Sequence, residues 1–293
     1  MLPNSSSEQQ TSIICDSNDY IPTTSSANTS PSCTEYSKKG TPWFLREKSL
    51  EYCYSELSKH PSLLEKVQKS IEIIKKTLEM YNTPIALGFN GGKDSVVIVN
   101  LLIMYLLEKF KVEQCTAENS ASSSLQQLSA LLNQHCLFFH FSIPHQFPEM
   151  DQFLEQSSKL YGVTLKLIDA SKGFKQGLVE LIETSSSKLD AVFMGTRKID
   201  PDGRNIDVFE KTSDGWPEMM RVSPILEWDY QDVWQFILTL HIPYCTLYDM
   251  GYTSLGSVND TVRNEALRQP DDSFLPAYFL MDGTLERFGR MKK

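Results

Sequence analysis

The stretch Pro84-Ile-Ala-Leu-Gly-Phe-Asn-Gly-Gly-Lys-Asp-Ser95 decides the fold that we expect for this chain. Ile85 to Gly88 is a short aliphatic segment after a proline, which predicts a buried strand. Asp94 to Phe110 carries apolar residues on nearly every side, which predicts a buried helix. The sequence therefore predicts a strand, a short loop and a helix in succession.

The loop between these two elements, Asn90 to Ser95, has the composition of an anion-binding turn. Its two glycines let the backbone come close to a ligand, and the amide groups that begin a helix attract negative charge. Lys93 adds a full positive charge. A phosphate group is the occupant that this combination favours.

The spacing differs from that of a Walker A motif, which has four residues between its glycines and a Ser or Thr directly after the lysine. Here three residues separate Gly88 from Gly92, and Asp94 follows Lys93. The alternative is a turn between strand and helix that contains glycines but binds no ligand. The Lys-Asp-Ser sequence that follows the glycines favours a nucleotide site instead. The stretch resembles the pyrophosphate loop of the adenine nucleotide α-hydrolase-like group, which divides ATP between its α- and β-phosphates.

Composition fits one medium-sized enzyme. The chain has 293 residues and a formal net charge of −9, which argues against nucleic acid as the main partner. No apolar run reaches the length of a membrane span, so we expect no membrane insertion. The cysteines form no CxxC pair and indicate neither a zinc site nor a disulfide framework; they are Cys15, Cys33, Cys53, Cys115, Cys136 and Cys245.

Residues 1–40 are rich in Ser, Thr and Asn and lack a periodic apolar pattern, which predicts a disordered tail. A mitochondrial transit peptide would be rich in arginine, and this tail contains none. We therefore expect a cytoplasmic protein. Order is expected from Thr41-Pro42, a cap followed by proline in the first turn of a helix.

Beyond the tail, strands and helices are expected to alternate. This order predicts an α/β fold with a doubly wound, mostly parallel sheet, whose ligands lie at the carboxyl ends of the strands. We expect a nucleotide-binding core at 41–210, a helical and loop extension at 211–293, and a polar surface excursion at 111–133. The expected helices are 43–58, 62–81, 94–110, 147–162, 174–183 and 228–240, and the expected strands are 85–88, 137–143, 163–168 and 191–195.

A second chemical stretch, Gly195-Thr-Arg-Lys-Ile-Asp-Pro201, directly follows the last expected strand. Arg197 can clamp phosphate oxygens with two parallel hydrogen bonds, and Asp200 can hold a magnesium ion or a sugar hydroxyl. An Asp-Pro pair is more often a simple turn, but its place at the ligand edge favours a function.

A third stretch contains residues suited to an aromatic, phosphorylated ligand. Trp216 can stack on an aromatic ring and Arg221 can meet a phosphate, although a lone tryptophan is more often part of a core. Residues 244–264 combine glycines and hydroxyls with little periodicity, which indicates a loop that lines a ligand.

Together these segments resemble the eukaryotic FAD synthase (FMN adenylyltransferase) family over most of residues 80–293. One departure concerns an acid, because the family usually has Thr-Asp before its Trp-Pro segment and this chain has Thr212-Ser213-Asp214. The motifs that carry the resemblance are Asn90-Gly-Gly-Lys-Asp94, Phe147-Pro-Glu149, Gly195-Thr-Arg197, Asp200-Pro201, Trp216-Pro217, Arg221, Leu247-Tyr-Asp249, Gly251-Tyr-Thr-Ser-Leu-Gly256 and Arg287-Phe-Gly-Arg290.

The resemblance implies transfer of AMP from MgATP to FMN, which gives FAD and pyrophosphate. It implies catalytic roles for Asn90, Lys93, Asp94, Arg197, Asp200, Arg287 and Arg290. It implies magnesium at Asp94 and Asp200, and substrate contacts at Phe89, Asn90, Gly91, Gly92, Lys93, Asp94, Ser95, Arg197, Asp200, Asp214, Trp216, Arg221 and Tyr252. Client apoflavoproteins would fit as partners, but no sequence feature identifies a surface for them.

Three other functions share the fold or the motifs. A phosphoadenylylsulfate (PAPS) reductase needs a redox-active cysteine near its C-terminus, whereas the last cysteine here is Cys245. A tRNA-thiolating enzyme needs paired cysteines and a basic surface, which this chain lacks. A non-catalytic nucleotide-binding module stays open, since motifs alone do not establish turnover.

Overall fold

We describe the protein from a computed structural model, which places residues 43–46, 49–112, 121–201 and 203–291. The expected tail, residues 1–40, and the expected helix start at Thr41-Pro42 lie outside the described residues. None of the described helices is both long and apolar enough to cross a membrane.

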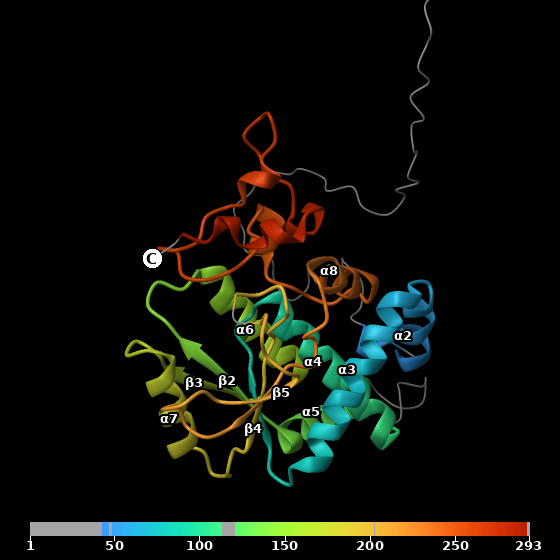
Figure 1. Cartoon of the computed structure of the whole chain (residues 1–293). Coiled ribbons are helices and arrows are strands. Elements are labelled where there is room, and N and C mark those ends of the chain that lie inside the picture. The colour runs from blue at the N-terminus through green and yellow to red at the C-terminus, as the bar shows by residue number, and fades with distance from the viewer. Residues whose placement is uncertain (1–42, 47–48, 113–120, 202, 292–293) are drawn as a thin grey trace, which may run out of the picture.

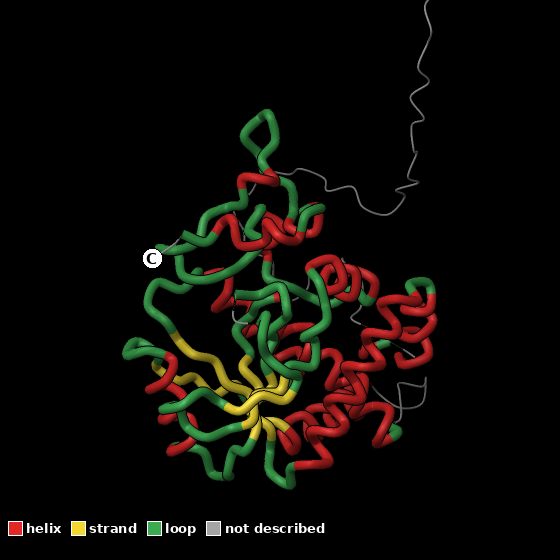
Figure 2. Tube along the Cα trace, in the orientation of Figure 1, coloured by secondary structure: helices red, strands yellow, loops and turns green. Residues whose placement is uncertain are grey.

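Six strands form one sheet in the order β3-β2-β1-β4-β6-β5 (Figures 1 and 2). Every neighbouring pair is parallel except β5 with β6. The predicted doubly wound, mostly parallel sheet is therefore confirmed. The strands are β1 (Ile85–Gly88), β2 (Cys136–Ser142), β3 (Leu165–Asp169), β4 (Ala191–Phe193), β5 (Phe209–Lys211) and β6 (Met220–Val222).

Helices cover both faces of this sheet. The α-helices are α2 (Ser49–Ser58), α3 (Pro61–Met80), α4 (Lys93–Phe110), α5 (Ala121–His135), α6 (Pro148–Tyr161), α7 (Phe174–Glu183) and α8 (Tyr230–Thr239). On one face, Ala86 and Val192 pack in a cluster with Leu178 and Leu181 of α7. On the other, Leu87 and its neighbours join the larger core that contains α3, α4, α6 and α8. Figure 1 shows α7 on the opposite side of the strands from α3 and α4.

Helix α4 is the centre of the larger core. All of its residues from Ser95 to Leu107 are buried, because α3, α5 and α8 pack around it. The one polar side chain in the middle of this run is Asn100, which accepts a hydrogen bond from Nε1 of Trp43 and donates one to the hydroxyl of Tyr161. A buried amide is tolerated in an apolar helix when its polar atoms are paired in this way.

After α8, the described residues up to Met291 form short 3-10 helices and loops, which gather at one end of the molecule (Figure 1). These helices are η2 (Thr246–Met250), η3 (Glu265–Leu267), η4 (Ala277–Phe279) and η5 (Gly283–Gly289); a further one, η1 (Trp43–Leu45), precedes α2. Isolated bridges join this region to the segment after β2, between Ser257 and Gln146, and to itself, between Thr261 and Arg290.

Three sequence expectations for local structure were wrong. The expected surface excursion at 111–133 contains helix α5, while residues 113–120 lie outside the described part. The expected single helix at 43–58 is a 3-10 turn followed by α2, with residues 47–48 not described. Strands β5 and β6 were not expected, and they extend the sheet to Val222.

Candidate nucleotide site

Segments that were expected to bind ligand converge at the carboxyl ends of the parallel strands. The loop Asn90 to Ser95 follows β1, and the stretch Met194 to Asp200 follows its neighbour β4. Residues 145–147 follow β2, and the backbone of Val258 bonds the carbonyl of His145. The topology alone therefore places these segments at the edge where open α/β sheets bind their ligands.

Asn90 organises the loop from within. Its Oδ1 accepts hydrogen bonds from the Gly92 amide at 3.0 Å and from the Ser95 hydroxyl at 3.1 Å. Gly91 has a φ of +73°, a conformation that is unfavourable for other residues. The side chain of Phe89 is buried in the core between Phe153 and Tyr161, so only its backbone reaches the loop.

The first helical amide of α4 already has a partner. The Lys93 N–H donates to the hydroxyl of Tyr248 at 3.0 Å. Burial raises the pKa of Tyr248 well above its ordinary value, so this hydroxyl is neutral. A phosphate that binds the amides of Gly92 and Lys93 must therefore exchange with Asn90 and Tyr248.

Lys93 is buried rather than exposed at the tip of the loop. Its side chain is only 2% exposed, and Nζ lies 3.0 Å from Oδ2 of Asp94. The same Nζ donates a hydrogen bond to Oε1 of Glu286 and lies 5.4 Å from the ring centroid of Tyr230. The ammonium is thus enclosed by the C-terminal region and α8, with two carboxylates as partners.

Arg197 is the second buried cation of the site. Its side chain is 1% exposed; Nη2 lies 2.6 Å from Oε2 of Glu286, and Nε lies 3.1 Å from Oδ1 of Asp94. Burial would lower the pKa of Arg197, but the surrounding carboxylates outweigh it and the guanidinium stays charged. Its Nη1 is buried without a hydrogen-bond partner, which leaves donor capacity for an anion.

Asp200 shapes the turn that carries Arg197. Its Oδ2 accepts a hydrogen bond from the Arg197 amide at 2.8 Å, and its own amide donates to the Arg197 carbonyl at 3.0 Å. Burial raises the pKa of Asp200, although Arg197 opposes the shift. At Asp94, burial also disfavours the charge, but Lys93 and Arg197 outweigh it and lower the pKa. The two carboxyl groups therefore differ in acidity although they flank the same guanidinium.

The resemblance implied catalytic roles for the two C-terminal arginines, Arg287 and Arg290. Arg287 lies in the 3-10 helix η5, where residues three apart lie above one another, and it is exposed. Arg290 follows the helix; Nη1 donates to the Leu255 carbonyl at 2.6 Å, and Nη2 lies 3.3 Å from Oδ1 of Asp260. Arg290 is therefore bound to the protein, whereas Arg287, three positions earlier in the sequence, faces solvent.

Tyr252 packs beside the Phe147-Pro148-Glu149 motif. Its ring centroid is 5.4 Å from that of Phe147, with an interplanar angle of 69°. Phe147 begins α6, directly after the segment that follows β2. The structure therefore joins two of the motifs that suggested the family, although they are a hundred residues apart in the sequence.

The hairpin that carries Asp214 and Trp216 leaves the sheet at the amino ends of the parallel strands, opposite the carboxyl ends where the nucleotide loop lies. Met220 begins β6 opposite Ala191, at the amino end of the parallel strands. Gly215 lies close to the side chain of Lys175 near the start of α7, since a Cβ on Gly215 would lie 3.3 Å from Nζ of Lys175. Among the described residues, the side-chain partners of Arg197 are Asp94, Asp200 and Glu286, and none of them comes from this hairpin.

Sequence reasoning missed two residues of the site. Glu286 bridges Lys93 and Arg197, yet a single glutamate in a C-terminal segment carries no pattern that identifies it. Tyr248 lies inside the Leu247-Tyr-Asp249 motif, which gave a signal of similarity but no role.

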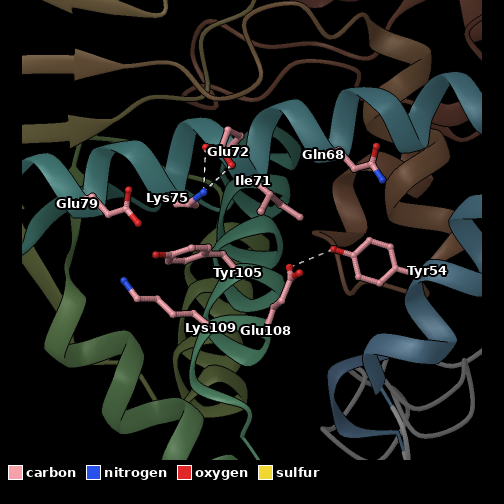
Figure 3. A pocket seen from close by; sticks show the side chains of 9 residues that line it. All are labelled: Tyr54, Gln68, Ile71, Glu72, Lys75, Glu79, Tyr105, Glu108 and Lys109. Atoms are coloured by element: carbon pink, nitrogen blue, oxygen red, sulfur yellow. Dashed lines mark hydrogen bonds and ion pairs between the residues drawn. The ribbon is translucent and has the colours of Figure 1, made fainter.

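A separate cavity of about 520 Å³ lies between α2, α3 and α4 (Figure 3). Its charged groups mainly satisfy one another: Lys75 pairs with Glu72, and the Tyr54 hydroxyl donates to Glu108. None of the residues expected at the nucleotide site lines it; the lining residues are Tyr54, Gln68, Ile71, Glu72, Lys75, Glu79, Tyr105, Glu108 and Lys109.

The fold and the loop define a class, an α/β nucleotide-binding domain with a pyrophosphate-type loop. In agreement, the family profile described as "Phosphoadenosine phosphosulfate reductase domain" matches residues 84–263. The chain is 38% identical over 230 residues to a probable FAD synthase of Schizosaccharomyces pombe, covering 78% of this chain and 80% of that protein. The chain belongs to the FAD synthase family, as the motifs had suggested.

Other relatives agree, although some are longer. A probable FAD synthase of Caenorhabditis elegans is 36% identical over 233 residues, and the match spans 78% of this chain but only 40% of that protein. The crystal structure of Candida glabrata FMN adenylyltransferase superposes with a TM-score of 0.69 at 22% identity, covering 83% of this chain and 96% of that chain. This structural likeness confirms the fold.

Proposed function

We propose that the chain is an FMN adenylyltransferase. In this reaction a phosphate oxygen of FMN attacks the α-phosphorus of ATP, the α–β bridging bond breaks, and pyrophosphate leaves as FAD forms. The observation that carries the proposal is the 38% identity to a probable FAD synthase, which extends over 78% of this chain and 80% of that relative. Candida glabrata FMN adenylyltransferase, which shares the fold, has been solved with FMN and the ATP analogue AMPCPP.

The residues at the sheet edge suit a displacement that needs no protein nucleophile, only positioning and charge stabilisation. The loop from Asn90 to Ser95 would hold the β- and γ-phosphates, with Nη1 of Arg197 as a further donor. Arg287 is exposed and would approach the charge that builds up as the α–β bond breaks. Arg290, held by Leu255 and Asp260, would reinforce it from a fixed position.

The carboxyl groups fit a magnesium ion that enters with ATP. Magnesium is commonly bound by one or two carboxylates together with substrate phosphates, and Asp94 and Asp200 both flank Arg197. Oδ1 of Asp94 is buried and makes no hydrogen bond, so it could accept a metal ion beside the Nε of Arg197 that lies 3.1 Å away. When bound, the ion would neutralise charge on the phosphates; among the described residues no cluster of three ligating side chains could bind it alone.

We also propose contacts to the flavin from Trp216 and Tyr252, with Asp214 as the displaced family acid and Arg221 as a phosphate ligand. Trp216 is 41% exposed in the hairpin between β5 and β6 and therefore available for stacking. We place the enzyme in the cytoplasm, on the basis of a tail without arginine. Client apoflavoproteins are a further proposed class of partner.

Labelled ATP tests the reaction. With purified protein, FMN and Mg²⁺, label at the α-phosphate of ATP should appear in FAD, and label at the γ-phosphate should appear only in pyrophosphate. Pyrophosphatase must be absent. Release of labelled orthophosphate from the γ position would indicate kinase or ATPase chemistry and would overturn the proposal. Binding of ATP without any product would favour a non-catalytic module instead.

A further inference from the structure

Glu286 connects the C-terminal helix η5 to the two buried cations of the nucleotide site. Its side chain is 8% exposed. One carboxylate oxygen accepts a hydrogen bond from Nζ of Lys93, and the other accepts one at 2.6 Å from Nη2 of Arg197. These contacts span 193 and 89 positions of sequence, so one side chain joins three distant segments.

The charge balance argues that Glu286 does not serve to attract substrate. Lys93 and Arg197 face three carboxylates, those of Asp94, Asp200 and Glu286, so the cluster carries an excess of negative charge. Without Glu286 the two cations and two remaining carboxylates would balance. A third carboxylate next to a polyphosphate opposes binding by Coulomb repulsion. The contribution of Glu286 to the site must therefore lie in the geometry that it imposes on the neighbouring residues.

The backbone of Glu286 is held as firmly as its side chain. The Thr253 hydroxyl donates to the Glu286 carbonyl at 2.6 Å. The Asn264 amide donates to the Thr253 hydroxyl at 2.9 Å and to the Leu285 carbonyl at 2.8 Å. The next residue in the chain is Arg287, so a residue fixed at both ends directly precedes the first of the two C-terminal arginines.

We propose that Glu286 is a positioning residue that fixes the arginine segment, residues 287–290, against the nucleotide loop. Lys93 then contributes to catalysis mainly through Glu286, and its ammonium stays on the carboxylate while phosphates occupy the loop amides and Arg197. This inference rests on the proposed adenylyltransferase function. The chemistry of the reaction is unchanged; the new element is what aligns the arginines with the phosphates.

Steady-state kinetics of Glu286→Gln provide the first test. The variant keeps the shape of the side chain but loses the charge that holds both cations. Loosening the arginine segment should lower kcat by about a hundredfold, the scale of a misplacement of roughly 1 Å. The KM for ATP should not rise, because binding to the loop is retained and the repulsion from a third carboxylate is removed. Glu265→Gln is the matched control, since Glu265 is an exposed glutamate in the same region.

A double-mutant cycle separates the two roles of Lys93. If Lys93 acts through Glu286, the kcat of Lys93→Met/Glu286→Gln should be about that of the worse single variant. If Lys93 bound phosphate directly, the losses would multiply, and the proposal would be overturned. Glu286→Asp keeps the charge with a shorter side chain, so its kcat should lie between those of Glu286→Gln and the wild type. A kcat no higher than that of Glu286→Gln would also contradict the proposal.

Hydrogen exchange tests the tether without any turnover. In Glu286→Gln, amides of residues 283–291 should exchange at least about tenfold faster than in the wild type, whereas those of α4 should be unchanged. Unchanged exchange at 283–291 would overturn the inference even if activity fell. If the wild type makes no FAD but the exchange result holds, the proposed function has failed while the tether stands.

Discussion

Nε of Arg197 lies 3.1 Å from Oδ1 of Asp94, although the two residues follow different strands of the sheet. The contact places the acid of the loop after β1 against the cation that follows β4. Lys93 binds the other oxygen of the same carboxylate at 3.0 Å. Asp94 is thus the link between the two motifs that were predicted separately to bind phosphate.

The stability that Asp94 provides should depend on pH. Lys93 and Arg197 lower its pKa in the folded state, against the effect of burial, so its contribution is present above the unfolded pKa of about 4. It is lost as the pH falls through the folded value. Asp94→Asn should therefore cost about 1.5–3 kcal/mol of unfolding free energy at pH 7, and less below about pH 4. Urea titrations at both pH values measure this difference, and a constant difference would contradict the assignment.

Gly256→Ala should displace the guanidinium of Arg290. A Cβ at this position would lie 2.3 Å from the guanidinium carbon and both of its terminal nitrogens. Because the obstacle is the end of a flexible side chain, the protein should still fold, with a melting temperature within a few degrees of the wild type. Turnover should fall about as far as in Arg290→Ala.

The double variant Gly256→Ala/Arg290→Ala supplies the control for this experiment. Once the guanidinium is absent, the three atoms nearest to the added methyl group are removed. The double variant should then turn over as fast as Arg290→Ala alone. A further loss of activity would show that Gly256 matters for a reason other than the position of Arg290.

Trp216→Ala should weaken FMN binding with little effect on stability. The side chain is 41% exposed, so its removal should change the free energy of unfolding by less than about 1 kcal/mol. Loss of stacking should raise the Kd for FMN by roughly tenfold, as measured by quenching of flavin fluorescence. Trp228→Ala is the contrasting variant; Trp228 is buried and bonded to Ser70, so this change should cost about 3–5 kcal/mol. Unaltered FMN binding in Trp216→Ala would remove the residue from the site.

The thiols of the described region should be unreactive. Cys53, Cys136 and Cys245 are buried, and burial raises the pKa of Cys245 to about 12. A variant with serine at positions 15, 33 and 115 should react with a disulfide reagent only after denaturation, and its activity should survive the reagent. Rapid native labelling with loss of activity would instead favour cysteine chemistry of the reductase kind.

Local signals predicted some elements well. Strand β1 and helix α7 have the predicted bounds, because a proline before the strand and a glycine before the helix mark their starts. Strands β5 and β6 have three residues each, too few for a period, and they exist because they pair with β4 and with each other. Helix α5 was missed because serines interrupt its apolar pattern.

The candidate site was also predicted only in part. The segments after β1 and β4 follow from topology, since adjacent parallel strands bring their carboxyl ends together. The partners of Lys93 could not be predicted, because an ion pair with Glu286 depends on how a distant segment packs. Sequence patterns identified the charged and polar groups at the carboxyl ends of the strands. Which of these groups pair with one another became clear only from the tertiary structure.

The burial of helix α4 limits which parts of the protein can move during the reaction. With Ser95 to Leu107 buried on all sides, it cannot rotate or slide without opening the core, and the loop at its start is equally fixed. We expect substrate entry and product release to involve the exposed turns after α8 instead, where Met281 and Phe288 are 87% and 69% exposed, although Tyr248 and Ala277 of the same region are packed in the core. The sheet side of the site and the anchor at Glu286 are therefore its fixed parts, and movement is confined to the exposed turns around them.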